Sequence, residues 1–79
     1  MWYLYIIRCA ENSLYTGITK DVSKRIAEHN RKTGCNYTRA RRPVELVYQE
    51  SHPTRSSALK REIRIKQWPR PKKLDLIDG

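Results

Sequence analysis

The order of apolar and polar positions predicts three short strands. Residues 3–8 are rich in aliphatic, β-branched and aromatic side chains, and residues 14–18 repeat that composition after a polar turn at 10–13. A third strand is expected over 44–49. Because successive side chains of a strand point to opposite faces and both faces of 3–8 are apolar, we expect this strand to be central.

Helical spacing predicts two longer helices and a short one. A helix is expected over 21–31, with the Asp21 carboxylate near the positive end of its dipole. A second helix is expected over 56–68, capped by Ser56 or Thr54 and ended by the two prolines that follow. Residues 72–77 predict a short last helix.

These elements predict an α/β fold of the α+β type in a single domain, residues 1–79. The predicted architecture is a small three-stranded antiparallel sheet flanked by two to three helices, in the order β-β-α-β-α(-α). Residues 32–43 have no clean period and carry four basic side chains, which favours a basic loop.

A carboxylate interrupts the apolar side of the second predicted helix. At about 100° per residue, Glu62 lies roughly 40° from Ala58 and near the middle of the broad side that also holds Ile63 and Ile65. A carboxylate that is half-buried without a partner costs free energy, so Glu62 should pair with a cation. The cation is either Lys66, one helical turn further on, or a metal ion in a phosphate-cutting site.

The charge balance indicates a polyanionic partner. The 79 residues include 17 Lys or Arg and 8 Asp or Glu, a formal net charge of +9, and the basic residues cluster in the sequence. Such a balance in a small domain is typical of nucleic-acid binding. Two cysteines, Cys9 and Cys35, form no disulfide framework and indicate free thiols in a reducing cytoplasm. We expect no signal peptide and no membrane contact, because no apolar run approaches ~20 residues.

Residues of one sequence motif lie, in order along the chain, on the predicted strands and helices. Tyr3-Leu4-Tyr5 lies on the first predicted strand, and Tyr15-Thr16-Gly17 lies on the second. Arg25 and His29 are one turn apart on the first helix, and Glu62 lies on the second. The chain thereby resembles the GIY-YIG nuclease superfamily, and most closely its short stand-alone bacterial members. Tyr3 stands where that family usually has glycine.

The resemblance implies a catalytic set of Tyr5, Tyr15, Arg25, His29 and Glu62. Glu62 would hold one Mg²⁺ or Mn²⁺ ion, and Arg25 would clamp the phosphate. Tyr5 would be the general base or orient the attacking water, with Tyr15 in support. The alternatives are that both tyrosines are sheet aromatics, that Arg25 is a solvated helix charge and that His29 is a core histidine.

The hairpin register decides whether the tyrosines share a site. If Gly17 lies opposite Tyr5, the missing side chain leaves room for the ring, and Tyr5 and Tyr15 share one face. A slip of one residue would separate them. Nucleic acid would be bound by a further set, with Tyr37 stacking on an exposed base: Lys24, Tyr37, Arg39, Arg41, Arg42 and Lys66.

We therefore expect a metal-dependent endonuclease that acts on DNA. Structured or branched DNA is the favoured substrate, and DNA repair is the expected role. RNA stays open as a substrate, and a partner protein would supply specificity. The main alternative is a nucleic-acid binding module that keeps the fold without cutting, which Tyr3 favours. A third class is a structural protein whose basic face docks an acidic partner.

Overall fold

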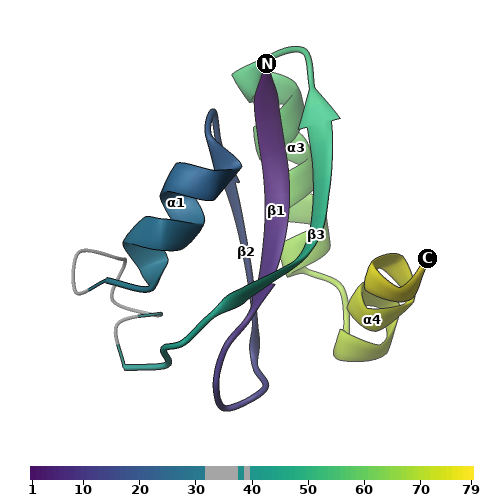
Figure 1. Ribbon diagram of the computed structural model, residues 1–79. Coiled ribbons are helices and arrows are strands. Elements are labelled where there is room, and N and C mark those ends of the chain that lie inside the picture. Colours follow the sequence, from purple (N-terminus) through teal and green to yellow (C-terminus); the bar gives the residue numbers. More distant parts are fainter. Residues whose placement is uncertain (32–37, 39) are drawn as a thin grey trace.

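The computed structural model describes residues 1–31, 38 and 40–79 (Figure 1). Its sheet consists of β1 (Trp2–Arg8), β2 (Leu14–Thr19) and β3 (Glu45–His52). The strands pair antiparallel in the order β2-β1-β3, so β1 is central, as its two apolar faces predict. The predicted fold class is confirmed.

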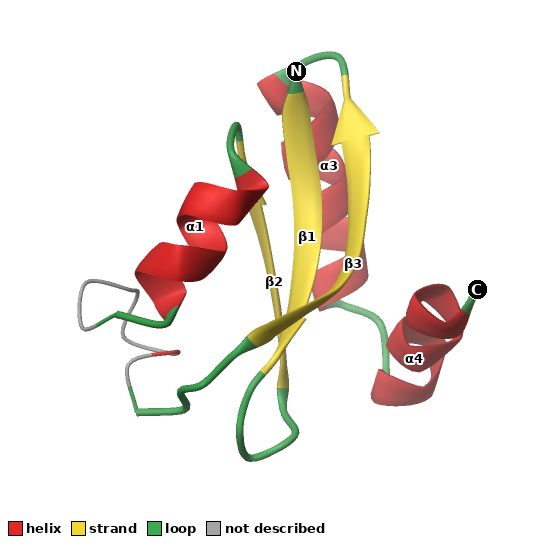
Figure 2. Ribbon diagram, viewed as in Figure 1, coloured by secondary structure: helices red, strands yellow, loops and turns green. Residues whose placement is uncertain are grey.

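Three helices complete the described chain: α1 (Val22–His29), α3 (Arg55–Lys66) and α4 (Arg70–Asp78) (Figure 2). The Asp21 side chain accepts a hydrogen bond from the Lys24 backbone at the start of α1. Within the described residues, no helix is long and apolar enough to cross a membrane.

Some element boundaries differ from the predicted ones. Strand β3 runs on to His52, where a turn was expected, because it pairs with β1 along its whole length. Thr54, not Ser56, caps α3 by accepting a hydrogen bond from the Ser57 backbone. Pro71 does not end a helix but lies in the first turn of α4, where a proline loses no helical hydrogen bond.

The sheet separates two apolar clusters. On one face Tyr5, Ile7, Cys9 and Val44 are buried beneath Ile26 of α1. On the other face Leu4, Ile6 and Ile65 of α3 are buried, with Trp68 and partly buried residues of β2, β3 and α4 around them. In Figure 1, α3 lies behind β1 and β3, and α1 lies apart from it. The sequence prediction for Ile63 was wrong, because this side chain is 53% exposed.

Candidate active site

The hairpin register places the two tyrosines on one face of the sheet. Tyr5 pairs with Gly17 and Ile7 pairs with Tyr15, so Tyr5 and Tyr15 are not separated by a slip. Their ring centroids are 6.5 Å apart. A Cβ atom on Gly17 would lie 2.6 Å from the Tyr5 Oη atom, so the Tyr5 ring occupies the space that glycine leaves open.

Helix α1 brings His29 to the same face. His29 is fully buried in the last turn of α1, and its ring lies 5.9 Å from the Tyr5 ring and 5.3 Å from the Tyr15 ring. The next residue, Asn30, fixes this end of the helix, because its side chain bonds both the backbone N–H and the carbonyl of Val44. The position of His29 is therefore tied to the start of β3.

Two hydrogen bonds join His29 to buried hydroxyl groups. Its Nε2 atom is 2.9 Å from Tyr5 Oη, and its Nδ1 atom is 2.7 Å from Thr38 Oγ1. Thr38 is fully buried. Thr38 was not predicted as a site residue, since a short polar side chain in an aperiodic stretch of sequence gives no pattern that predicts such a contact.

Arg25 lies one turn before His29 on α1 and contacts the Tyr5 hydroxyl. Its guanidinium also approaches Glu28, with 3.4 Å between Nη1 and Oε1. Burial acts to lower the pKa of Arg25, but the hydrogen bonds and charges of Tyr5 and Glu28 outweigh it and raise this pKa above its ordinary value. Arg25 is therefore a permanent cation against the Tyr5 oxygen.

The direction of the hydrogen bonds follows from the donors. A guanidinium can only donate, so the Tyr5 oxygen is the acceptor toward Arg25. In the tautomer of His29 with an unprotonated Nε2, the Tyr5 hydroxyl donates to Nε2. The Nδ1–H group of His29 then donates to Thr38. Burial lowers the pKa of His29, and the Arg25 charge lowers it further, which favours the neutral imidazole that this assignment requires.

Glu62 lies on α3, and its side chain is 14% exposed. Its Oε2 atom is 3.3 Å from Nζ of Lys66, which is the helix ion pair that the sequence allowed. The Lys66 ammonium also lies 5.8 Å from the centroid of the Tyr15 ring. Lys66 thus connects the carboxylate of Glu62 to the edge of the tyrosine cluster on β2.

The carboxylate of Glu62 fits a single hydrated metal ion. Among the described residues no group of three or more His, Cys, Asp or Glu side chains is placed to hold a metal. Mg²⁺ keeps several waters and is often bound by one or two carboxylates plus substrate phosphate. Lys66 is half-exposed, so its side chain can turn into solvent when another cation takes the carboxylate.

The residues proposed to bind a nucleic-acid backbone lie in different settings. Lys24 is exposed on α1. Arg41 pairs with Glu11 at 2.6 Å, and Arg42 donates to the Asn30 carbonyl. Cys35 and the proposed site residues Tyr37 and Arg39 lie outside the described residues.

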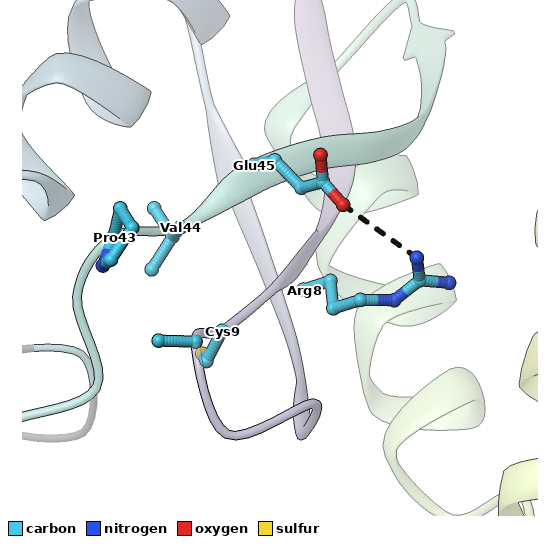
Figure 3. A pocket seen from close by; sticks show the side chains of 6 residues that line it. Arg8, Cys9, Pro43, Val44 and Glu45 are labelled. Atoms are coloured by element: carbon cyan, nitrogen blue, oxygen red, sulfur yellow. Dashed lines mark ion pairs between the residues drawn. The ribbon is translucent and has the colours of Figure 1, made fainter.

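One cavity among the described residues lies away from the tyrosines. It has a volume of about 300 Å³ and lies where β1 ends and β3 begins (Figure 3). Cys9, a free thiol, and Val44 line it, and Arg8 and Glu45 pair across 3.6 Å beside it. None of the five proposed catalytic residues lines this cavity, so it adds no group to the site.

Comparison with known proteins identifies the same pattern over nearly the whole chain. The family model described as the GIY-YIG catalytic domain matches residues 1–75. A UPF0213 protein of Staphylococcus saprophyticus is 57% identical over 75 residues, which covers 95% of this chain and 92% of that protein. A UPF0213 protein of Staphylococcus aureus is 56% identical over the same shares.

Two solved structures share the fold. The solution NMR structure of a UPF0213 protein from Bacillus halodurans has a TM-score of 0.63 and 39% sequence identity, covering 99% of this chain and 84% of that chain. A solution NMR structure of a protein from E. faecalis has a TM-score of 0.61 and 38% identity, covering 90% of this chain and 76% of that chain.

Proposed function

Because this chain belongs to the family of GIY-YIG catalytic domains, and within it to the UPF0213 proteins, we propose that it is a metal-dependent endonuclease that hydrolyses phosphodiester bonds in DNA. A GIY-YIG catalytic domain implies nuclease-type phosphodiester chemistry. The observation that carries the proposal is the hydrogen bond of 2.9 Å between Tyr5 and a buried, neutral His29, with Arg25 on the same phenol oxygen.

This arrangement gives the Tyr5 phenol a route for a proton. A phenol with an ordinary pKa near 10 is a poor base, but here its proton can pass to Nε2 of His29 while its oxygen takes a proton from the attacking water. Arg25 stabilises negative charge on the phenol oxygen during this transfer. Burial makes the resulting imidazolium costly, so His29 holds the proton only transiently.

Arg25 also controls access to Tyr5. Tyr5 is 1% exposed, whereas the Arg25 side chain is 30% exposed and held by one carboxylate at 3.4 Å. An arriving phosphate offers a guanidinium two oxygens at once and competes with that carboxylate. A guanidinium has five N–H groups, so Arg25 can bind a phosphate at this entrance and still donate to the Tyr5 oxygen. The half-exposed Tyr15 lies beside this entrance and supports the phosphate or the water.

Glu62 would hold the metal ion, with Mg²⁺ or Mn²⁺ matching its hard oxygen ligand. When bound, such an ion neutralises charge on the phosphate and on the leaving oxygen. Lys66 pairs with this carboxylate at 3.3 Å and would be displaced from it by the ion. A single carboxylate supports a one-metal rather than a two-metal reaction.

The test is cleavage of labelled flap and junction DNA with Mg²⁺ or Mn²⁺. We expect Glu62→Ala to lower the rate by about 10³-fold, since charge stabilisation by the ion contributes several kcal/mol. We expect Tyr5→Phe to lower it by about 10²–10⁴-fold, the range for a lost proton-transfer group. Glu45→Ala removes an exposed carboxylate of β3 and serves as the control. Equal cleavage rates for wild type and Glu62→Ala would refute this mechanism.

A second candidate function is nucleic-acid binding without cleavage. The ion pair between Glu62 and Lys66 favours it, because it satisfies the carboxylate without any metal. Tyr3 favours it as well, since it stands in place of the family glycine. This function predicts DNA binding with a steep salt dependence and no cleavage with any divalent metal.

A further inference from the structure

A second polar cluster lies on the other flank of α3, around Glu50 of β3. The Glu50 carboxylate accepts hydrogen bonds from the Tyr48 hydroxyl, from Nε2 of His52 and from Nε of Arg61. Burial alone would raise the pKa of Glu50, but these donors lower it. The Nδ1 atom of His52 is in turn 2.7 Å from Oγ of Ser57. The carboxylate is therefore ionised and its oxygens are occupied by donors.

This cluster forms the wall of a pocket of about 250 Å³. The residues that line the pocket are hydrogen-bond donors or cations, and they are His52, Ser57, Lys60, Arg61 and Arg64. Three cations against the one carboxylate of Glu50 leave the pocket positively charged. Its chemistry therefore matches an anion.

The cations of this pocket are available to a ligand. Among the described residues, neither Lys60 nor Arg64 has a carboxylate within ion-pair distance. Arg61 contacts Glu50 through Nε. Its guanidinium is held in place by the Trp68 ring, at 5.2 Å from the centroid. The pocket thus offers one oriented cation, Arg61, beside the exposed side chains of Lys60 and Arg64.

The pocket and the candidate active site use opposite flanks of one helix. At about 100° per residue, Ser57, Lys60, Arg61 and Arg64 fall within an arc of roughly 100°, whereas Glu62 lies about 150° from the centre of that arc. The pocket faces His52 on β3, and the Glu62–Lys66 pair faces Tyr15 on β2. Because β1 lies between these two strands, the sites are at least ~10 Å apart.

We propose that this pocket binds a backbone phosphate of a second segment of the nucleic acid, distinct from the segment held at Tyr5 and Glu62. The inference rests on the proposed function for the identity of the first segment. The planar groups of Arg61 and Arg64 bind phosphate oxygens, and Lys60 adds a point charge. A substrate with two arms then contacts both edges of the sheet, whereas a short linear duplex contacts one.

The experiment compares two doubly substituted proteins that have the same net charge. Lys60→Gln/Arg64→Gln alters the pocket, and Lys20→Gln/Lys73→Gln removes two positive charges from residues that neither line the pocket nor contact Trp68. Binding of a labelled three-way junction and of a short linear duplex is measured by fluorescence anisotropy over a range of salt concentrations. EDTA is present, so that affinity is measured without cleavage. Circular dichroism melting checks that each variant is folded.

We expect the pocket variant to bind the junction roughly tenfold more weakly than the control variant does at 0.1 M salt, with the slope of log K against log salt smaller by about 1–2. Binding of the short duplex should be the same for both variants. Equal affinities of the two variants for the junction, or an equal loss on both DNAs, would overturn the pocket's role. Cleavage is scored separately, so pocket-dependent binding without cutting would refute the nuclease and keep the pocket.

Discussion

Adding one methyl group at Gly17 should destabilise the protein and disturb the candidate active site together. The Cβ atom of Gly17→Ala would lie 2.6 Å from Oη and 2.7 Å from Cζ of Tyr5. Both distances are far inside ordinary van der Waals contact, and the Tyr5 ring is 1% exposed, so it cannot move into solvent. Either the ring or the paired backbone of β2 must shift.

The cost can be bounded from the structure. Overpacking of a filled core typically costs about 1–3 kcal/mol. A shift of the Tyr5 ring also strains its 2.9 Å hydrogen bond to His29, and a typical hydrogen bond contributes about 0.5–1.5 kcal/mol. We therefore expect a loss of about 2–4 kcal/mol in the free energy of unfolding. In a domain of this size that is a fall in Tm of roughly 8–30 °C.

Urea denaturation followed by tryptophan fluorescence measures the loss. Ser51→Thr is the matched control, because it adds one methyl group at an exposed position of β3 and should change stability by about 0.5 kcal/mol at most. Tyr5→Phe removes the atom at 2.6 Å but keeps the one at 2.7 Å, so it should rescue Gly17→Ala only in part. A loss for Gly17→Ala no larger than that of the control would refute the reasoning.

Three further predictions concern the core, a cap and the response to acid. Ile65→Ala should cost about 2–5 kcal/mol in urea denaturation, because Ile65 is fully buried, while Ile63→Ala, at 53% exposure, should stay near wild type; similar losses would contradict the assigned core. Thr54→Ala should lower the urea-derived stability by about 0.5–2 kcal/mol and Thr54→Ser should restore it, whereas no change would show that the cap is dispensable. Folding lowers the pKa of His29 below its ordinary value of 6.5, so the unfolded chain binds a proton at this residue before the folded protein does. The free energy of unfolding should therefore be at its full value above about pH 6.5 and should fall below that pH. Urea midpoints measured across pH should fall less for His29→Gln than for wild type.

The strand order and the register could be predicted because both depend on period-two patterns. Tyr3, Tyr5 and Ile7 alternate with Leu4 and Ile6, so both faces of β1 had to be covered, which requires neighbours on both sides. The ends of β3 and α4 were predicted less well. Polar residues such as His52 extend β3 because backbone pairing with β1, not side-chain hydrophobicity, sets its length.

The candidate site could be predicted only for residues with a positional pattern. Tyr5 and Tyr15 are placed by the sheet register, and Arg25 and His29 by the helical turn between them. Thr38 could not be found, because its contact with His29 depends on where an aperiodic segment returns to the sheet. The cluster of Glu50 and Ser57 was not predicted either, because its contacts form across the turn between β3 and α3.

The burial of Tyr5, His29 and Thr38 affects how relatives of this protein should be judged. These side chains fill the interior between α1 and the sheet, so evolution would retain them for stability even in a lineage that had stopped cutting nucleic acid. Arg25 and Glu62 lie nearer the surface, where a lineage without activity can replace them at little cost. Loss of this outer pair, rather than survival of the interior three, should therefore distinguish inactive descendants from working enzymes.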